Sequence, residues 1–370
     1  MAGDARAAVQ ELAAGLRQPR NSLVAFFCSP SYELDRLAAE VAERFRGADV
    51  IGCTTAGEIT PVGYMDGSIT GFSLSAECCC AVTELIPNIS ELQVSHGADV
   101  YDRLAEMLAR RGHTVDPVDT FCLMLIDGLC GNEETVLASL QRRLGAVPML
   151  GGSAGDGLNF GRTHVYHDGR FHRDAALVTL FKLKGGFRTF KHQHFTSTET
   201  RMVVTGADTA RRVVTEINAE AAGVEYARII GLPYQELTPM IFAEFPVMVR
   251  VGGDYYVRSI QKVNEDASLS FYCAIDEGVV LTLARREDLV KKLADCFTDL
   301  RREIDRPQLV IGFDCVLRSL EAEARQQRQI VSRLLSENNV IGFSTYGEQF
   351  AGMHLNHTFT GVAIGGSVRT

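Results

Sequence analysis

One nine-residue signature stands near both ends of this 370-residue chain. Residues 50–58 read VIGCTTAGE, and residues 340–348 read VIGFSTYGE. The match continues without a gap to residues 72 and 362, with eight of 23 positions identical. Repeats constrain a fold strongly, because related segments form related structural units. We therefore expect one such unit in each half of the chain.

A third, weaker copy of the signature lies between these two. Residues 147–156 (VPMLGGSAGD) keep the order of an apolar strand end, a glycine, small residues, and a glycine followed by an acid, with one residue fewer. An acid therefore closes each copy, as Glu58, Asp156 and Glu348. The outer pair and this middle copy together predict a chain built from related units.

Composition limits the class of protein. The length predicts two or three domains, and a hydrophobic share of 46% is enough for large buried cores. The net charge of -9 argues against a nucleic-acid-binding protein, which usually presents a basic face. No apolar run approaches the roughly 20 residues that span a bilayer, and the N-terminus has no apolar signal core. We predict a cytoplasmic protein that binds neither nucleic acid nor a membrane.

The ten cysteines are predicted to be reduced thiols. The sequence has no secretion signal and no CxxC pair, which argues against disulfides and against a structural zinc site. Several of them lie inside apolar runs, where a thiol is usually buried. These are Cys28, Cys53, Cys122, Cys273 and Cys315.

Three segments show the order strand, helix, strand, turn, strand. Apolar residues at spacings of three and four mark the helices, and short apolar runs bounded by turn residues mark the strands. Asp168-Gly169 is predicted to form the type I′ turn of a hairpin. Helices are expected over residues 33–46, 133–144 and 319–337, and strands over 23–27, 50–53, 69–74, 121–126, 149–150, 175–182, 309–313, 340–343 and 359–364.

This order predicts an α/β protein of two packed domains with mixed sheets. The middle of the chain, residues 188–284, has a different pattern and places a domain boundary near residues 185–205. We expect an N-terminal domain over residues 1–190 and a C-terminal domain over residues 191–370. Within the middle segment we expect strands over residues 190–195, 202–205, 255–260 and 268–274, and a helix over residues 210–222.

The repeated turn is a candidate binding site. A strand-ending glycine followed by hydroxyl residues and Gly-Glu presents backbone N–H groups and hydroxyls in a concave loop, which can hold an anion or a polar ligand. Ligands of open α/β sheets tend to bind at the carboxyl ends of strands. The alternative is that the hydroxyls satisfy turn amides and that the acids pair with local donors. The candidates are Thr55, Gly57, Glu58, Ser153, Asp156, Thr345, Gly347 and Glu348.

Among the nine histidines, one pair is placed for ligation. His192 and His194 stand two apart in a strand-like segment and are predicted to share one face, between Phe190 and Phe195. An imidazole with apolar walls suits axial haem ligation, and it also suits a metal ion. The alternative is a pair of structural histidines in a core. Further candidates are His354 and His357, which follow the second Gly-Glu turn.

Signatures of enzymes are weak in this sequence. It contains no P-loop, no GxGxxG that opens a helix, and no HExxH. Residues 151–155 match GxSxG, but a nucleophile elbow requires a helix directly after the serine, and a hairpin is predicted there instead. Cys53 is disfavoured as a nucleophile because Phe343 takes its place in the last copy. We therefore favour a binding or sensing protein over an enzyme.

Together these motifs resemble the FIST-domain proteins, bacterial sensory proteins with an N-terminal and a C-terminal FIST half. The resemblance covers roughly residues 20–366. The segments that carry it are residues 51–58, 151–156, 165–181, 256–259 (YVRS), 277–278 (EG) and 342–348, with Asn356 and Thr358.

The resemblance implies intracellular ligand sensing that is coupled to a separate signalling protein. The stand-alone branch, which this chain resembles more closely, implies haem b bound by His194 or, next, by His192, and nitric oxide as the signal. It also implies regulation of a sensor histidine kinase and, in some members, of cyclic-di-GMP enzymes. No kinase or cyclase segment follows the last copy, so the output is expected to pass to such a partner. A homodimer is one arrangement left open.

A competing hypothesis is a haem-independent receptor for a small polar ligand, such as an amino acid. The Gly-Glu turns would then hold the ligand together with Arg258 and Asn356. A third hypothesis is a scaffold that binds its kinase without any ligand.

Overall fold

The computed structural model describes residues 4–93, 97–365 and 367–368, and it divides the chain into two compact units. The repeat domain comprises the chain up to His192, Leu293–His354, and the chain from Phe359 onward. The insert domain comprises Gln193–Lys292 and Leu355–Thr358. The chain therefore passes between the two units four times. The division in space differs from a division along the sequence, and the predicted domains 1–190 and 191–370 stay a prediction.

Three copies of one strand plan make up the repeat domain. In each copy two strands pair in parallel, and the last strand of the copy pairs antiparallel with the first. The three sequence signatures fall at the end of the second strand of each copy. The strands are β1 (Asn21–Cys28), β2 (Asp49–Thr54) and β5 (Ile69–Ser75); β7 (Thr120–Ile126), β8 (Met149–Ser153) and β11 (Ala175–Leu183); and β22 (Leu309–Cys315), β23 (Val340–Thr345) and β26 (Thr358–Ile364).

After its signature, each copy forms a short hairpin that joins the sheet of another copy. The hairpin of the first copy pairs with β23, that of the last copy with β8, and that of the middle copy with β2. The exchange thus runs once around the three copies and closes on itself. The hairpin strands are β3 (Glu58–Thr60) and β4 (Gly63–Met65), β9 (Val165–His167) and β10 (Arg170–His172), and β24 (Glu348–Phe350) and β25 (Met353–Leu355).

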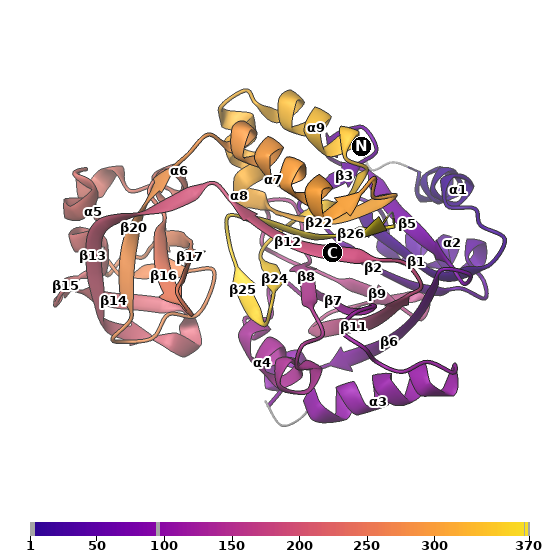
Figure 1. The fold of residues 1–370 in the computed structure, drawn as a ribbon. Helices are drawn as coiled ribbons and strands as arrows, with labels where there is room; N and C mark the ends of the chain where they lie inside the picture. The colour runs from indigo at the N-terminus through magenta and orange to yellow at the C-terminus, as the bar shows by residue number, and fades with distance from the viewer. Residues whose placement is uncertain (1–3, 94–96, 366, 369–370) are drawn as a thin grey trace. The chain divides into compact units, whose positions relative to one another are not determined.

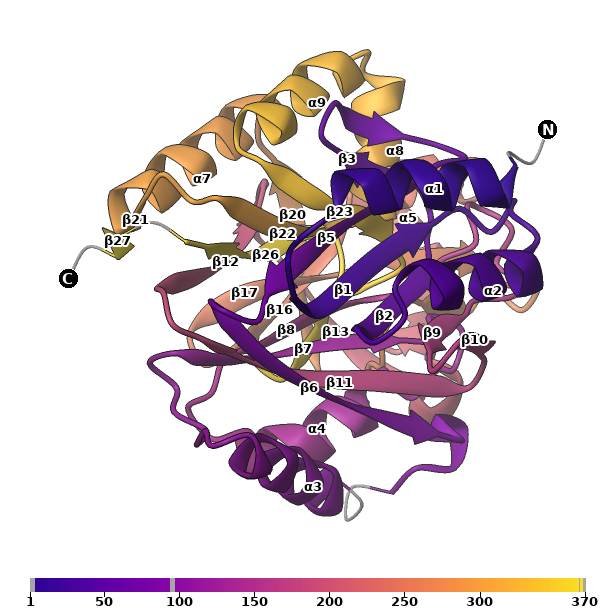
Figure 2. The ribbon, with the colours of Figure 1, turned by 90° about the vertical axis from the view of Figure 1, so that its right-hand side faces the viewer.

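Two or three helices accompany each copy. Figure 2 shows α1 and α2 beside β1 and β2, α3 and α4 beside β6 and β11, and α7 with α8 and α9 beside the sheet of β22 and β26. Strand β6 (Cys79–Pro87) extends the middle sheet, and β12 (Phe187–Gln193) extends the last. The helices are α1 (Ala5–Gly15), α2 (Leu34–Arg44), α3 (Gly97–Arg110), α4 (Glu133–Leu144), α7 (Leu289–Glu303), α8 (Val316–Ala324) and α9 (Arg328–Glu337).

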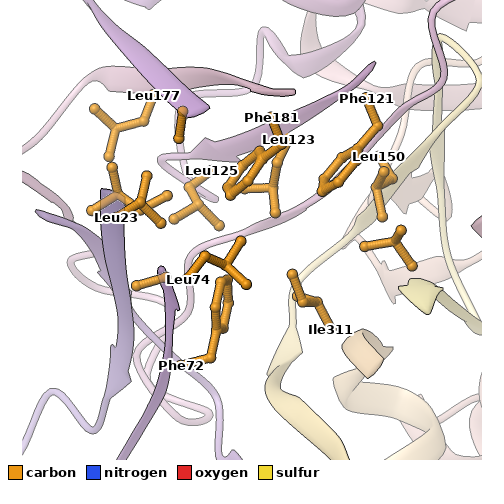
Figure 3. Close-up of a cluster of buried hydrophobic side chains, with 14 of the residues drawn as sticks. Leu23, Phe72, Leu74, Phe121, Leu123, Leu125, Leu150, Leu177, Phe181 and Ile311 are labelled. Atoms are coloured by element: carbon orange, nitrogen blue, oxygen red, sulfur yellow. The ribbon is translucent and has the colours of Figure 1, made fainter. Parts of the chain in front are cut away.

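The inner faces of the three sheets share one hydrophobic core (Figure 3). Phe72 comes from the first sheet, Phe121 and Phe181 from the middle sheet, and Ile311 from the last. Phe121 and Phe181 stack with their ring centroids 4.8 Å apart. Because each sheet contributes to one core, no sheet buries its inner face by itself.

The first glycine of each signature brings two parallel strands close together. A β-carbon on Gly52, Gly151 or Gly342 would collide with a backbone carbonyl oxygen of the neighbouring parallel strand. The colliding oxygens belong to Phe26, Met124 and Gly312 respectively. The shared glycine therefore has a steric cause, since a side chain at that position would separate the parallel pair.

Most of the insert domain lies between β12 and α7 in the sequence, and this part is rich in β-strands. Its long strand β13 joins two halves of an eight-stranded sheet, visible among the strands labelled in Figure 1. Its elements are β13 (Phe195–Asp208), β14 (Val213–Ile217), β15 (Glu220–Ala221), α5 (Ala222–Ile230), α6 (Pro239–Glu244), β16 (Val247–Val251), β17 (Asp254–Arg258), β18 (Ile260–Val263), β19 (Leu269–Phe271) and β20 (Val280–Arg286).

The mixed α/β class and the strands of the three copies are confirmed. The hairpin at Asp168-Gly169 is also confirmed, with φ angles of 48° and 80° that suit a type I′ turn. Among the described residues, no helix is long and apolar enough to cross a membrane. All ten cysteines lie among the described residues and none forms a disulfide, and the five predicted to be buried are buried.

Two predicted helices are corrected. The helix expected over residues 210–222 is wrong, because β-branched residues there form β14, and the backbone turns at Asn218 and Ala219 with positive φ. The helix expected over residues 319–337 is two helices. The chain bends at Gln326, whose φ of 57° is left-handed and cannot continue an α-helix.

Candidate functional site

The first and middle signatures meet at a pocket of about 780 Å³ in the repeat domain. The first signature contributes Thr55, Ala56, Gly57 and Glu58 to its lining. The middle copy contributes Asp156 and the loop that follows it. Pockets of this volume accept small organic ligands, which typically occupy about 300–1,000 Å³. The structure therefore brings together four of the predicted residues, namely Thr55, Gly57, Glu58 and Asp156.

Glu58 is fully buried yet lines this pocket. Its carboxylate accepts hydrogen bonds from the Thr55 hydroxyl at 2.5 Å, and from the N–H and hydroxyl of Ser68 at 2.9 and 2.7 Å. Burial raises the pKa of the Glu58 carboxyl from 4.5 to about 7, although the hydrogen bonds from Thr55 and Ser68 oppose the shift. A small change in its surroundings therefore changes its charge near neutral pH.

Asp156 organises the loop at the other side of the pocket. Its carboxylate accepts three consecutive backbone N–H groups, from Phe160, Gly161 and Arg162, at 2.8 to 2.9 Å. The Tyr346 hydroxyl also donates to it. With these donors, Asp156 shapes the pocket rather than presenting a free charge to a ligand. Asp156 thus accepts hydrogen bonds from local donors, as Glu58 does from Thr55 and Ser68.

Basic side chains complete the pocket lining. Arg162 and Arg173 are exposed, and His164 is half-buried. Burial lowers the pKa of the His164 imidazole below its ordinary 6.5, so this ring is neutral at pH 7. Asp66, at the rim, already pairs with Arg328 at 2.6 Å. The pocket thus has a buried carboxyl at its wall and two guanidinium groups at its opening.

The signature of the last copy contacts the first and middle signatures but contributes no residue to the lining of this pocket. The Thr345 hydroxyl donates to the carbonyl oxygens of Ser153 and Gly347, at 2.7 and 2.9 Å. Ser153 and Glu348 are fully buried at the paired strands β8 and β24. None of these four residues lines the pocket of the first signature. They join the middle and last copies.

One residue distinguishes the first turn from the last. Ala56 of the first copy aligns with Tyr346 of the last copy. The Tyr346 ring is buried, stacks on Phe160 with centroids 4.6 Å apart, and bonds Asp156. The small side chain of Ala56 lines the pocket instead. Alanine at this position leaves room that tyrosine would fill.

Arg258 and Asn356 belong to the insert domain, not to the pocket of the turns. Asn356 is fully buried, and its side-chain oxygen lies 3.5 Å from the backbone N–H of Ser259. Arg258 lines a separate pocket of the insert domain. The ten predicted pocket residues are therefore distributed over three places.

His192 and His194 lie where the chain leaves the repeat domain. His192 ends the repeat domain segment within β12, and His194 stands between β12 and β13 in the insert domain. The His194 imidazole is fully buried, and its ring centroid lies 4.4 Å from that of Phe195. Neither histidine lines a pocket described here. Haem ligation by His194 or His192 stays a prediction.

Several pocket residues carried no usable signal in the sequence. Arg162, Arg173 and Ser29 lie outside every copy of the signature, and only the fold brings them to the turns. His164 also lies outside every copy of the signature. A repeat identifies the residues that the copies share, whereas a ligand site also uses those that differ.

The fold and these pockets define a mixed α/β protein of three repeats with a β-rich insertion. The chain matches the FIST N domain over residues 22–220 and the FIST C domain over residues 222–351. It therefore belongs to the FIST family, whose domains are sensor domains of signal transduction. No curated protein matches the chain. The point at which one FIST match gives way to the other lies inside the insert domain, near β15.

Proposed function

We propose that this chain is a sensory receptor for a small zwitterionic ligand of the amino-acid class, bound in the pocket of the first and middle signatures. One observation carries the proposal: the pocket combines the buried Glu58 carboxyl with the exposed guanidinium groups of Arg162 and Arg173. An amino acid carries the complementary pair of charges, an ammonium and a carboxylate. Charge-assisted hydrogen bonds to both ends would fix its orientation.

The state of Glu58 gives this binding a recognisable signature. With a pKa of about 7, the carboxyl is partly protonated at neutral pH. An ammonium group placed beside it would favour the charged form and lower that pKa. Binding would therefore release protons. Calorimetric titrations in buffers of different ionisation enthalpy measure this release directly, and it should disappear in Glu58→Gln.

The screening experiment is a thermal-shift panel of the twenty amino acids, followed by calorimetry. A specific ligand at 100 times its Kd should add about 2.7 kcal/mol to the free energy of unfolding. Ala56→Tyr should abolish the shift by filling the pocket, and Arg162→Ala should weaken it. Arg170→Ala, an exposed arginine outside the pocket, is the matched control and should change nothing.

Glu348→Gln provides a second control, at the aligned and equally buried position of the last copy. Loss of binding in Glu58→Gln alone supports the assignment of the pocket. Equal loss in both variants would mean that the acids act through the stability of the repeat domain. A panel without any saturable shift would contradict the proposal and favour a scaffold without a ligand.

Haem binding and nitric-oxide sensing stay a prediction. Their support is the resemblance together with the buried imidazole of His194 beside an aromatic ring. Titration with ferrous haem and then nitric oxide tests them, using wild type, His192→Ala and His194→Ala. A Soret band that one substitution abolishes would support haem. Weak uptake that neither substitution changes would contradict it.

The output of the sensor is likewise proposed rather than observed. A FIST sensor without an enzymatic role must pass its signal to another protein, and we propose a sensor histidine kinase as that partner. The cytoplasmic location, a homodimer and a link to cyclic-di-GMP enzymes stay predictions. Kinase autophosphorylation measured with and without the chain, and with the ligand found in the panel, tests the coupling.

A further inference from the structure

The insert domain holds a pocket of about 520 Å³ that differs in charge from the pocket of the turns. Arg201, Arg250 and Arg258 line it, and Asp276 is the one acid among its lining residues. The Asp276 carboxylate accepts a hydrogen bond from the Thr209 hydroxyl at 2.9 Å. The pocket of the turns offers charges of both signs, whereas three of the four charged residues that line this pocket are arginines.

Strand register places two of the arginines on one face of the sheet. Arg201 of β13 pairs with Thr282 of β20, and Thr282 pairs in turn with Met248 of β16. Arg250 follows two residues after Met248 and pairs with Tyr255. Because paired residues and alternate residues of antiparallel strands share a face, Arg201 and Arg250 stand over the same surface.

An aromatic ring holds one of these guanidinium groups in place. The Arg250 guanidinium lies over the Tyr255 ring, 5.8 Å from its centroid, and its Nε donates to the Gly253 carbonyl at 3.3 Å. Within the described ranges of the chain, neither Arg201 nor Arg250 forms an ion pair with an acid. Guanidinium groups that share a pocket repel one another, and a bound anion removes this repulsion.

The walls between these charges are largely apolar. Ile275, Val279 and Val280 are among the lining residues, beside Tyr255, whereas Val249 and Val251 alternate with Arg250 along β16 and face the other side of the sheet. A bare inorganic anion would leave these walls uncovered. A ligand with a compact negative group and a planar, partly apolar body would use the arginines, the tyrosine and the apolar wall together.

We infer that the insert domain carries a second ligand site, for an organic phosphate of nucleotide size. The phosphate contacts Arg201 and Arg250, and Arg258 adds positive charge at the pocket. The planar body packs against Tyr255 and the apolar wall. Arginine suits this role because its fork of N–H groups matches the oxygens of a phosphate. This site is separate from the amino-acid pocket and does not depend on it.

The test is calorimetric titration of the full chain with adenosine 5′-monophosphate at low and at moderate salt. We expect one saturable site whose affinity falls as salt rises. Arg201→Ala and Arg250→Ala should each weaken binding by roughly tenfold to a hundredfold, as expected for a charge-assisted contact. Arg285→Ala, an exposed arginine of β20 outside the pocket, is the matched control and should bind like wild type.

Two further comparisons test the contact with Tyr255 and the independence of this site from the pocket of the turns. Tyr255→Leu should weaken binding of adenosine monophosphate more than it weakens binding of inorganic phosphate, because the ring contacts the planar body and also positions Arg250. Glu58→Gln should not affect either ligand, which keeps this site distinct from the pocket of the turns. Absence of saturable binding would overturn the inference. So would equal losses in Arg285→Ala and Arg201→Ala, or equal affinities for inorganic phosphate and the nucleotide.

Discussion

A single carboxyl, Glu58, links the stability of the chain to pH. Its pKa is about 7 in the folded protein against an ordinary value of 4.5, so between these values the folded state holds more protons than the unfolded state. Its contribution to stability is therefore most favourable below about pH 4.5 and declines as the pH rises to 7.

Glu58→Gln should remove this dependence on pH. The difference in unfolding free energy between variant and wild type should grow in favour of the variant from pH 5 to pH 8, by on the order of 3 kcal/mol at most. Urea unfolding of both proteins at several pH values measures it. A constant difference across that range would mean that Glu58 is charged in the folded state throughout.

A hydrogen bond from the first copy reaches a buried ion pair of the last copy. Arg318 donates to Asp314 at 2.6 Å, with both side chains at most 2% exposed, and the Tyr64 hydroxyl from the hairpin of the first copy bonds the same carboxylate. Arg318→Ala should cost about 3–5 kcal/mol, because it leaves a buried carboxylate without its cation. Chemical denaturation measures the loss.

The control for this pair is Arg302→Ala, which removes an exposed partner of Asp299 on α7. That change should cost at most about 1 kcal/mol, since exposed ion pairs contribute little. A loss below about 1 kcal/mol in Arg318→Ala would contradict the structural role given to the buried pair.

At the scale of elements, the contact between parallel strands depends on the first glycine of each signature. Gly342→Ala should destabilise the fold by about 3 kcal/mol or more, because the added β-carbon meets the backbone of β22 and must push the strands apart. The urea midpoint should fall with an unchanged slope.

Gly185→Ala is the matched comparison for this substitution. No atom lies within 4 Å of a β-carbon built at Gly185, so the exchange should change stability by less than about 1 kcal/mol. Similar losses at both positions would mean that alanine acts through the conformational freedom of the chain rather than through contact with β22.

The repeat made most of the strands predictable but not their partners. Short apolar runs and the shared signature located β2, β8 and β23. The pairing of β3 with β23 joins opposite ends of the chain, and no local pattern encodes such a distant partner. In the insert domain, the helix predicted over residues 210–222 is wrong because β-branched residues form β14 and tight turns at Asn218 and Ala219 reverse the chain.

The sequence identified only part of the candidate site, because no local pattern shows which segments meet in the fold. The shared acids pointed to Glu58 and Glu348 equally, yet Glu58 lines the pocket of about 780 Å³ and Glu348 does not. The sequence shows that Ala56 of the first copy corresponds to Tyr346 of the last copy. Only the structure shows that the Tyr346 ring packs on Phe160, whereas the small Ala56 leaves its turn open.

At the scale of the whole molecule, the repeat domain cannot be assembled from the N-terminal half alone. Residues 1–190 lack β23, the partner of β3, and β24, the partner of β8. Expressed alone, this fragment should fail to show a cooperative unfolding transition by circular dichroism, because the shared core loses the sheet of the last copy.

Deleting the insert domain makes the contrasting variant. Replacement of Gln193–Lys292 by a flexible linker of about ten to fifteen glycine and serine residues keeps all three copies. This variant should unfold cooperatively and retain the pocket of Glu58. Cooperative folding of fragment 1–190, or loss of folding in the deletion variant, would contradict the division into repeat and insert domains.

The exchange of hairpins among the three copies also affects how the repeat domain assembles and how its copies can diverge. Head-to-tail contacts that close after three steps are the arrangement of a ring of three identical subunits, in which every subunit completes the next. Here the ring is made by one polypeptide, so its assembly does not depend on protein concentration. Because the three copies belong to one chain, each copy can also acquire its own substitutions. A tyrosine can therefore close the turn of one copy while an alanine keeps the turn of another copy open.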